Sequence, residues 1–497
     1  MKSVVVNLIK PGFFLDSVAL MRFSRTIAGL TGVEEAALMM GTPSNREIMS
    51  DAGILAAEGE GASGSDLIIG IRAVSQDAAD QALEESVNLL DRSNVARGEG
   101  ETWRPRTIAA AVNSVPGANL ALISVAGEYA AAEARKALHQ GLSVMIFSDN
   151  VLLSEEVELK KEALELGLLV MGPDCGTAII DGVPLAFANR VNPGDIGIIG
   201  ASGTGIQEIS CLISRGGGGI SQAIGVGGRD LKEEVGGIST LMALDALEED
   251  AKTRHIVLVS KPPAPAVVEM IMKKVQASNK SFTLCFLGLT ELQLPDNARL
   301  ASTLKAAAES ALGGTSISEG FDPVTIAVGP PEGRSEVVGL FSGGTLCAEA
   351  QFVFCDTGEK VCSNVAIPGA AQLDKNSEGH RFIDLGDDEH TCGRPHPMID
   401  PAVRDDVVGK TLENPQVGVV LLDVVIGYGA HEDPAGHLVS SLGNLKADSP
   451  VVIASVTGTD ADIQDRSVQV KFLEEAGVLV APSNTDAALL ALACIGK

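Results

Sequence analysis

Two stretches of this sequence carry the same local pattern, and that pattern restricts the fold more than any other feature. The apolar, strand-like run 196–199 leads directly into the turn GASGTG (200–205) and then into a helix-like segment. The run 337–341 leads in the same way into the turn SGGT (342–345) and a second helix-like segment. A strand that passes through a tight turn into a helix is typical of α/β folds with parallel sheets.

Further pairs of segments match in the same order along the chain. AIGVGGRD (223–230) matches IDLGDDEH (383–390), and HIVLVS (255–260) matches VGVVLL (417–422). The offset between the copies is 140 at the two serines of the turns (342 − 202), and then 160 (383 − 223) and 162 (417 − 255). The second copy therefore carries about 20 additional residues, which we place in 356–380. This pattern indicates an internal duplication.

The length and the hydrophobic pattern together predict four domains. The chain has 497 residues, 45% of them hydrophobic, which is enough for several cores. The two copies form flavodoxin-like α/β domains at 193–315 and 335–497, joined by a segment rich in Pro and Gly. Before them, 106–192 is predicted to be a Rossmann-like domain with a parallel sheet. Residues 1–105 are predicted to form a compact α+β domain with a ferredoxin-like fold and a linker.

The expected elements of the first two domains follow from periodicity and capping signals. In 1–105 we expect strands at 4–9, 33–40 and 67–72, helices at 18–30, 48–55 and 78–90, and a linker at 92–105. In 106–192 we expect strands at 120–125, 143–147 and 168–171 and helices at 130–139 and 154–166. Ser154 is the expected N-cap of the last helix, and Gly167 stands just past its end.

Charge excludes some classes of partner. There are 37 Lys and Arg against 65 Asp and Glu, a formal charge of −28, and only 3% of the residues are aromatic. Nucleic-acid binding requires a basic face and aromatic stacking side chains, so nucleic acid is not expected as a partner. The same acidity opposes binding to an anionic membrane surface.

Targeting signals and cysteines point to the cytoplasm. No apolar run approaches the 18 residues of a membrane span, and the apolar run near the N-terminus is too short for a signal peptide. The eight cysteines are scattered without a C-x-x-C pair, which indicates reduced thiols. We therefore expect a cytoplasmic protein.

The two turns are the strongest candidate sites. Small residues allow close approach of a ligand to the backbone, and the first N–H groups of a helix have no intrahelical acceptor, so each turn suits phosphate or carboxylate. The alternative is that each turn only caps its helix, and Thr204 with Gln207 also fits a capping box. The candidate anion-binding residues are Ser202, Gly203, Thr204, Ser342, Gly343, Gly344 and Thr345.

A second group of candidates lies in the matched loops that follow the next strand of each copy. HTCGRPHPMID (390–400) contains Arg394, which suits bidentate binding of a carboxylate or phosphate, and His396, a candidate acid or base. The alternative is a loop whose polar residues only cap their neighbours. His390, Cys392 and His396 would need a fourth zinc ligand, for which Asp387 or Asp388 could serve. Their spacing is not a known structural-zinc pattern, so no metal is predicted.

In the first copy the equivalent loop contains a glycine pair and a charged pair. The candidate binding residues there are Gly227, Gly228 and Arg229, followed by Asp230, and ligands gather at the carboxyl ends of parallel strands. Lys261, in SKPP after the next strand, is a further anion-site candidate.

Specific motifs resemble a known family. MGPDCGT (171–177), DIGIIGASGTG (195–205) and AIGVGGRD (223–230) resemble the α subunit of succinyl-CoA synthetase and its ADP-forming acyl-CoA synthetase relatives. The half from 336 onward resembles the ligase domain of the β subunit. With GLFSGGTLCAEA (339–350) and RPHPMIDP (394–401), the sequence is similar to the FdrA family, which joins these halves to an N-terminal domain of its own.

The resemblance implies both a site and departures from it. In the synthetases two helix N-termini, one from each subunit, point at a shared phosphohistidine, and the matching helices begin here at Ser202–Thr204 and Ser342–Thr345. The segment 281–297, where the synthetases carry that histidine, contains none. The similarity starts near Pro105, after the glycine-rich CoA loop of the synthetases, and no ATP-grasp segment is evident. The resemblance therefore implies a CoA-binding-type domain at 106–192, with CoA a doubtful ligand.

Three functions follow as hypotheses. The first is an FdrA-type subunit of a carbamoyl or acyl transferase that uses inorganic phosphate as co-substrate. FdrA relatives are associated with allantoin use, where the implied reaction is phosphorolysis of oxalurate to oxamate and carbamoyl phosphate. The second is an ADP-forming acyl-CoA synthetase acting with partner chains. The third is a regulatory subunit that binds a metabolite without turnover. We expect a small-molecule substrate, partner subunits encoded alongside, and an oligomer.

Overall fold

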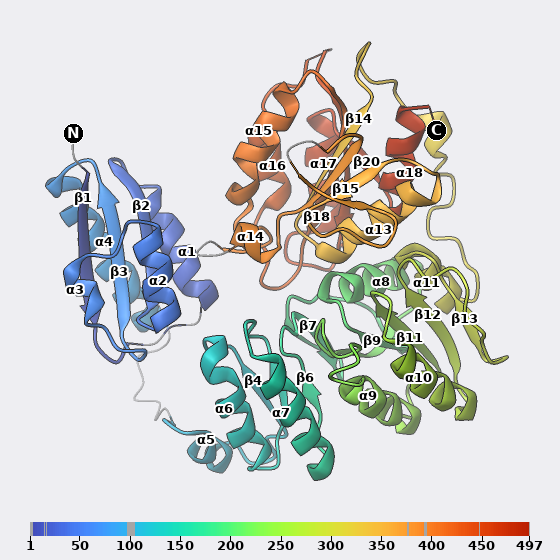
Figure 1. Ribbon diagram of the computed structural model, residues 1–497, viewed down its shortest axis with the longest axis horizontal. Coiled ribbons are helices and arrows are strands. Elements are labelled where there is room, and N and C mark those ends of the chain that lie inside the picture. Colours follow the sequence, from blue (N-terminus) through green and yellow to red (C-terminus); the bar gives the residue numbers. More distant parts are fainter. Residues whose placement is uncertain are drawn as a thin grey trace. The chain divides into compact units, whose positions relative to one another are not determined.

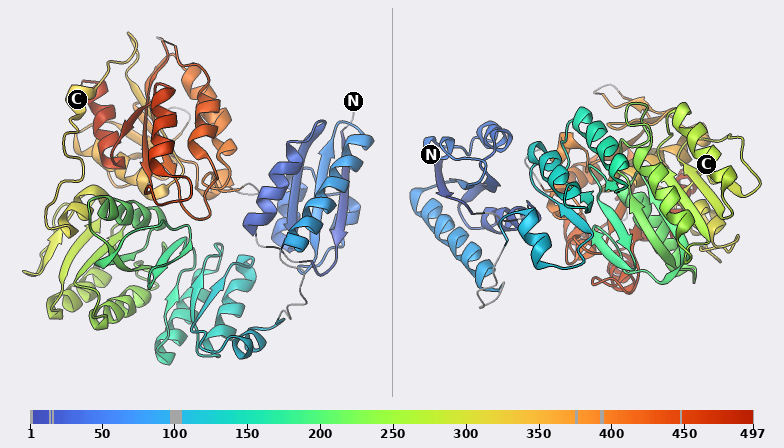
Figure 2. Two further views of the ribbon diagram at one scale, coloured as in Figure 1. Left: turned by 180° about the vertical axis from the view of Figure 1, so that it is seen from behind. Right: turned by 90° about the horizontal axis from the view of Figure 1, so that it is seen from below.

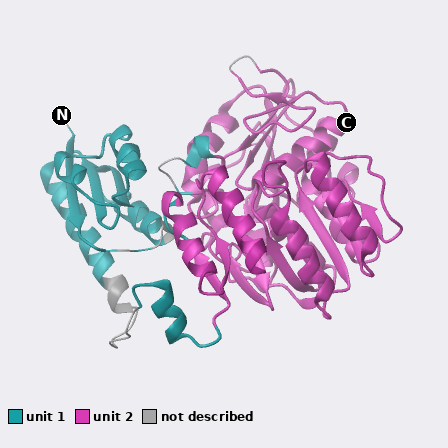
Figure 3. Cartoon of the chain, turned by 60° about the horizontal axis from the view of Figure 1, so that its bottom comes forward, with its two compact units in different colours: residues 1–117, 124–126, 388–395 teal, residues 118–123, 127–387, 396–497 magenta. Residues whose placement is uncertain are grey.

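The computed structural model describes residues 3–13, 15, 17–96, 105–374, 377–391, 395–446 and 448–496, without the side chains of 17, 18 and 92–96. The chain divides into two compact units (Figure 3). The first contains residues 1–117, 124–126 and 388–395, and the second contains the remainder.

The first unit is built on a three-stranded antiparallel sheet in the order β1-β3-β2. Alternate residues of β3 face opposite sides: Ile69 and Ile71 pack with α1 and α4, whereas Ile68 packs with Met49 of α2. The order is that of a ferredoxin-like sheet without a fourth strand among the described residues. Its elements are β1 (Val4–Lys10), α1 (Ser17–Ala28), β2 (Val33–Met40), α2 (Pro43–Asp51), α3 (Ala57–Glu60), β3 (Leu67–Ala73), α4 (Gln76–Ala96), α5 (Ile108–Ser114) and α14 (Asp388–Thr391).

The α+β prediction for this unit is confirmed, with two local corrections. The helix expected at 48–55 lies at Pro43–Asp51, because Thr42 caps it by accepting from Asn45 N at 3.2 Å and Pro43 occupies its first position. The start of the linker expected at 92–105 is wrong, since α4 continues to Ala96. Residues 97–104 lie outside the described part of the chain.

The second unit begins with a small parallel sheet in the order β4-β5-β6. The prediction that Ser154 caps α7 is wrong: the N-cap is Leu152, which makes no side-chain cap bond. Gly167 ends α7 in the left-handed region, with φ of 68°, as predicted. The elements are β4 (Leu120–Ile123), α6 (Gly127–Leu138), β5 (Ser143–Ile146), α7 (Leu153–Leu166) and β6 (Val170–Met171).

A seven-stranded sheet follows, in the order β13-β12-β11-β9-β10-β7-β8. Its parallel part has the strand order 2-1-3-4-5 of flavodoxin-like folds. The hairpin of β7 (Thr177–Ile180) and β8 (Val183–Ala186) extends it with an antiparallel pair. The other elements are β9 (Pro193–Gly200), α8 (Gly203–Arg215), β10 (Ile220–Gly225), α9 (Ile238–Glu249), β11 (His255–Ser260), α10 (Pro265–Ala277), β12 (Ser281–Phe286), β13 (Ala298–Leu300) and α11 (Leu304–Ala311).

The last sheet repeats the 2-1-3-4-5 order with β17-β14-β18-β19-β20. Two short strands, β15 (Val361–Ser363) and β16 (Ala371–Gln372), extend it beside β17 and lie in the segment where the additional residues were expected. The other elements are α12 (Pro323–Ile326), β14 (Glu336–Phe341), α13 (Gly344–Asp356), β17 (His380–Asp384), a 3-10 turn (Pro401–Arg404), α15 (Asp405–Glu413), β18 (Val417–Val425), α16 (Pro434–Leu442), β19 (Val451–Thr457), α17 (Arg466–Glu475), β20 (Leu479–Ala481) and α18 (Asn484–Cys494).

One hydrophobic core joins the two large sheets. It contains apolar residues of α8 and α11, which cover one face of the first sheet, and of α13 and α18, which cover one face of the second. Figure 1 shows α8 and α11 on the side of the green sheet that faces α13. The left view of Figure 2, seen from behind, shows the green and orange parts side by side. The two flavodoxin-like folds are therefore packed through a shared layer of helices rather than joined only by a linker.

The described cysteines are free thiols, as the sequence predicted. Cys175, Cys211, Cys285, Cys347, Cys355, Cys362 and Cys494 are free. Within the described ranges, no helix has both the length and the apolar character that a membrane crossing requires.

Two buried glutamates cross the shared layer. Glu208 and Glu349 are each the sixth residue of their helices, α8 and α13. Glu208 accepts hydrogen bonds from Thr457 Oγ1 at 2.5 Å and Asn484 N at 3.1 Å, both on the second fold. Glu349 accepts from Leu304 N, on the first fold, at 2.6 Å. Each helix therefore sends one carboxylate across to the other fold.

The pKa of Glu349 gives a pH-dependent stability. Burial raises its pKa to about 7, although hydrogen bonds from Asn484 and Leu304 oppose the shift. The folded state therefore holds a proton that the unfolded state has released, and stability falls as the pH rises towards 7. We predict that the free energy of unfolding of Glu349→Gln, compared with that of the native chain, increases by about 2 kcal/mol as the pH rises from about 5.5 to about 8.

Chemical denaturation at both pH values measures this difference. Glu474→Gln, on the exposed face of α17, is the matched control and should shift stability equally at both. The same stability difference for Glu349→Gln at both pH values would contradict the prediction.

Candidate functional site

The N-terminus of α8 forms directly after the first strand of its fold. Ser202 is the N-cap, and its Oγ accepts a hydrogen bond from Gly205 N at 3.0 Å. The predicted capping box of Thr204 and Gln207 is wrong, since the Gln207 side chain donates to Asn189 Oδ1 at 3.0 Å. The N–H groups of the first turn not bound by Ser202 have no intrahelical acceptor.

The N-terminus of α13 is already occupied in part by a carboxylate of the protein. Ser342 N and Gly343 N donate to Asp423 Oδ1 and Oδ2, each at 2.7 Å. Asp423 is buried, and Arg404 Nη1 donates to it at 3.0 Å. Burial raises the pKa of Asp423 and the guanidinium opposes the rise. Two of the N–H groups predicted to bind a ligand therefore bind Asp423.

The two helix N-termini meet. Ser202 Oγ and Thr345 Oγ1 form a short hydrogen bond, although they lie 143 residues apart in the sequence. A Cβ on Gly343 would lie 3.0 Å from Thr204 Cγ2, so the two turns are in van der Waals contact. We call this contact of Ser202 and Thr204 with Gly343 and Thr345 the α8–α13 junction. The positive ends of two helix dipoles converge there, which favours an anion.

Asp384, at the end of β17, lies beside the junction and was not predicted. A Cβ on Gly344 would lie 2.5 Å from Asp384 Oδ2, and Gly386 N donates to Asp384 Oδ1 at 3.0 Å. Burial raises the pKa of Asp384 to about 6, while the nearby charge of Lys261 lowers it. Asp384 can therefore act as an acid or base close to neutral pH. The sequence could have indicated this residue, because it stands at the end of a strand that matches one in the first copy.

His396 lies on the other side of the same loop. Its Nδ1 accepts from Met398 N at 3.2 Å, and a Cβ on Gly386 would lie 2.6 Å from its Nε2 and 2.8 Å from the Ser342 carbonyl oxygen. Burial, with the charge of Arg404, lowers the pKa of His396 to about 4. The ring is therefore neutral at pH 7 and carries its proton on Nε2, so it suits hydrogen-bond donation better than proton transfer.

The glycine pair of the first copy lies near α8. Gly227 has a φ of +85°, and a Cβ there would lie 2.2 Å from the Pro173 carbonyl oxygen, so only glycine fits. A Cβ on Gly228 would lie 3.7 Å from Asp174 Oδ2 and 4.0 Å from the Ala201 carbonyl oxygen, beside the α8 turn.

Arg229 and Asp230 turn away from the junction. Arg229 Nε pairs with Glu156 Oε2 at 2.9 Å, and Nη2 donates to the Val151 carbonyl oxygen at 2.9 Å. Asp230 accepts from Lys160 Nζ at 2.8 Å, and Lys160 also donates to Glu156 at 2.8 Å. These four charges sum to zero and join α7 to the loop after β10.

Three further candidates of the loop 390–400 are not described with the second unit. Arg394 and Cys392 lie outside the described residues. His390 lies in α14, which belongs to the first unit. Among the described side chains, no group of three His, Cys, Asp or Glu could hold a metal.

Comparison with known proteins places the chain in a family. It is 41% identical over 507 residues to the uncharacterized protein YahF of Escherichia coli strain K12, covering 98% of both chains. The chain belongs to the YahF family. Three segments of the chain match family models. Residues 340–494 match one described as CoA-ligase, residues 191–288 match a CoA binding domain, and residues 1–105 match a heavy metal-associated domain of AllF. The chain is therefore CoA-ligase-like.

More distant relatives match part of the chain. The α subunit 2 of the ADP-forming succinate–CoA ligase of Archaeoglobus fulgidus is 26% identical over 148 residues, 29% of this chain and 50% of that subunit. A subunit of the ADP-forming sulfoacetate–CoA ligase of Bilophila wadsworthia is 25% identical over 151 residues, 29% of this chain and 50% of that subunit. The chain thus spans about half the length of these two relatives.

One solved structure aligns with most of the chain, but at low sequence identity. The dinucleotide-forming acetyl-coenzyme A synthetase 1 of Ca. Korarchaeum cryptofilum, in complex with phosphate and ADP, is 16% identical. The match covers 80% of this chain and 86% of that one, with a TM-score of 0.35.

Two of the family models differ from what the residues predicted. The CoA binding domain model matches 191–288, whereas the CoA-binding-type domain was expected at 106–192 and a ligase-type domain at 193–315. The heavy metal-associated model covers 1–105, a segment with no Cys and no His. Soft transition metals prefer thiolate and imidazole ligands, so the residues of this segment do not fit such a metal.

The buried charge cluster gives a stability prediction. Lys160→Met leaves Glu156 and Asp230 with only one cation, Arg229, in a buried site. Removing one partner of a buried ion pair costs about 3–5 kcal/mol. We expect a lower midpoint of thermal denaturation and faster hydrogen exchange in α7. Lys161→Met, the exposed neighbour on the same helix, is the control, and equal midpoints for the two variants would contradict the prediction.

Proposed function

We propose that this protein is a subunit of an acyl-transfer enzyme of the ADP-forming CoA-ligase class, which holds phosphate or an acyl phosphate at the α8–α13 junction. The observation that carries the proposal is the hydrogen bond between Ser202 and Thr345, which brings two helix N-termini to one point. The free N–H groups of both first turns would bind the anion's oxygens.

The groups around the junction suit transfer of an acyl group to or from phosphate. Asp384, with a pKa near 6, would exchange the proton of the phosphate or of the attacking group. Neutral His396 would donate its Nε2–H to a developing oxyanion. Catalysis would rest on positioning and electrostatic stabilisation rather than on a covalent phosphoenzyme at 281–297, since no histidine lies there.

CoA would supply the thiol that accepts the acyl group. The first strand-to-helix turn of the segment matched by the CoA binding domain model contains Ser202, which the proposal assigns to the phosphate at the junction. We therefore derive no step in which that turn also binds the diphosphate of CoA. The domain predicted at 106–192, or a partner subunit, remains the proposed place for CoA.

A carbamoyl transfer is the second candidate, favoured by two observations. The N-terminal segment matches a domain model of AllF, and the chain lacks the histidine that a phosphoenzyme would need. In that reaction a phosphate oxygen attacks the ureido carbonyl of oxalurate, the C–N bond breaks, and the oxamate nitrogen takes the proton. The products are carbamoyl phosphate and oxamate. The CoA-ligase relatives favour the first candidate over this one.

Partner subunits are part of the proposal. The distant relatives are named as subunits of ligases, and this chain shows no ATP-grasp segment in its sequence. We propose that the nucleotide is bound by a separate chain encoded alongside, in a cytoplasmic hetero-oligomer.

Reconstitution with these partners distinguishes the candidates. We expect thioester, detected by thiol capture, from a carboxylate, CoA and ATP. Carbamoyl phosphate from oxalurate and phosphate, without thioester, would instead establish the second candidate. Phosphate binding without turnover in either assay would contradict both and leave the regulatory function.

A variant tests the junction itself. Thr345→Val removes the hydroxyl that joins the helices, and we expect phosphate binding to weaken about fivefold, equivalent to about 1 kcal/mol for one hydrogen bond. Titration followed by phosphorus NMR measures it. Thr303→Val is the matched control, because Thr303 caps α11 through Ala306 N and lies outside the junction. Equal affinities in both variants would overturn the assignment of the site.

A further inference from the structure

The two buried glutamates of the shared layer lie one helical turn below the junction, at equivalent positions in the two copies. Glu208 is four residues after Thr204 in α8 (208 − 204), and Glu349 is four residues after Thr345 in α13 (349 − 345). Four residues of α-helix rise about 6 Å. The groups that hold these two carboxylates therefore also hold the two first turns, where the anion is proposed to bind.

The last helix of each fold makes the same contact with the glutamate of the other fold. Leu304 is the first residue of α11, and its N–H donates to Glu349 Oε1 at 2.6 Å. Asn484 is the first residue of α18, and its N–H donates to Glu208 Oε1 at 3.1 Å. The internal duplication therefore places Leu304 and Asn484 at equivalent positions.

The side chains at these equivalent positions differ. Leu304 is buried in the shared hydrophobic core. Asn484 Nδ2 instead donates to Glu349 Oε2 at 2.6 Å and to the Leu346 carbonyl oxygen, in the first turn of α13, at 3.0 Å. Because its N–H also binds Glu208, Asn484 joins α8 to the start of α13.

Asn484 carries a cost that its leucine counterpart avoids. The residue is buried, and its Oδ1 has no hydrogen-bond partner among the described residues. A buried oxygen without a partner is unfavourable for folding, and a leucine at this position would remove it. Since burial alone favours leucine here, the contacts of Nδ2 account for the asparagine.

We propose that Asn484 is a positioning residue of the α8–α13 junction, which sets how the two first turns face each other and thereby the affinity for the phosphate proposed there. The inference rests on the proposed function, since it concerns the alignment of that same site. In this role Asn484 does not contact the anion. Its contacts with Glu208, Glu349 and Leu346 lie below the first turns and act through the two helices.

Phosphate binding to the full chain, followed by phosphorus NMR, tests this role. Asn484→Leu introduces the side chain of the equivalent position, keeps the N–H on Glu208 and removes both Nδ2 hydrogen bonds. We expect phosphate to bind about fivefold more weakly, an effect comparable to the loss of one hydrogen bond. Unchanged phosphate affinity in folded Asn484→Leu would overturn the proposal, because a residue that only fills the core would give that result.

A double-mutant cycle with Thr345→Val identifies the route of the effect. Two residues that act through the same alignment are not additive, so Asn484→Leu should weaken phosphate binding less in the Thr345→Val chain than in the native chain. Equal losses in the two chains would place the action of Asn484 outside the junction and contradict the proposal.

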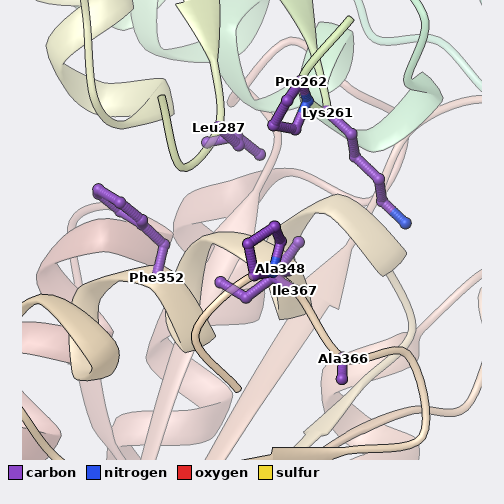
Figure 4. A pocket seen from close by; sticks show the side chains of 8 residues that line it. Lys261, Pro262, Leu287, Ala348, Phe352, Ala366 and Ile367 are labelled. Atoms are coloured by element: carbon purple, nitrogen blue, oxygen red, sulfur yellow. The ribbon is translucent and has the colours of Figure 1, made fainter. Parts of the chain in front are cut away.

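Phe352→Ala is the matched control on the same helix. Phe352 lines an apolar hollow beside α13, together with Leu287 of the first fold (Figure 4), and its side chain makes none of the hydrogen bonds of the junction. Phosphate affinity should be unchanged in this variant, and a loss as large as that of Asn484→Leu would count against the proposal. Circular dichroism verifies the fold of each variant. If Asn484→Leu does not fold, Asn484→Ala removes the same two hydrogen bonds without added bulk and gives the same test.

The failure of this inference is distinguishable from that of the proposed function. Phosphate binding that depends on Thr345 but not on Asn484 would reject the positioning role alone. Phosphate binding that depends on neither residue would reject the junction as the site and, with it, the proposed function.

Discussion

The contact between α8 and α13 is the constraint on which the rest of the second unit depends. Each helix follows the first strand of its sheet through a turn of only a few residues, so placing the two helices together also places the carboxyl ends of both sheets together. The buried carboxylates of Glu208 and Glu349 cross this contact and find backbone or side-chain donors on the other fold. A shifted packing of the two helices would leave both carboxylates buried without partners.

The electrostatics of the junction are local. The chain carries a formal charge of −28, which opposes any anionic ligand at long range. Asp423 adds a carboxylate at the start of α13, but Arg404 neutralises it at 3.0 Å. The groups that would bind the anion proposed at the junction are the helix N–H groups, which act over a few ångströms. The glycines of these turns would let such an anion approach those groups.

The sequence predicted the parts of this arrangement that depend on local pattern. Strand, turn and helix at each copy were found by periodicity, as were the α/β fold class and the extra segment near β15. The β7–β8 hairpin was missed, although Asp181-Gly182, both with positive φ, is a strong turn signal. Arg229 was grouped with the site because its loop matches the second copy, but a match between loops does not fix where a long side chain turns.

Long-range pairing lies outside the reach of such patterns. Asp423 stands alone as a charge inside an apolar strand, which signals a buried partner, yet nothing local identifies Arg404 as that partner. Likewise, the tautomer of His396 depends on Met398 N and on burial, which only the folded chain defines. Candidate residues could therefore be proposed where the chain repeats itself, whereas contacts between distant segments could not be predicted.

The shared core has a consequence for how a ligand enters and leaves. Many two-domain enzymes open and close around a hinge, but here the helices of both folds contribute to one continuous set of buried apolar side chains. Separating the folds would expose that core to water, at a cost far above thermal energy. A ligand of the proposed site would then enter and leave through small rearrangements at the rim of the junction rather than through domain closure.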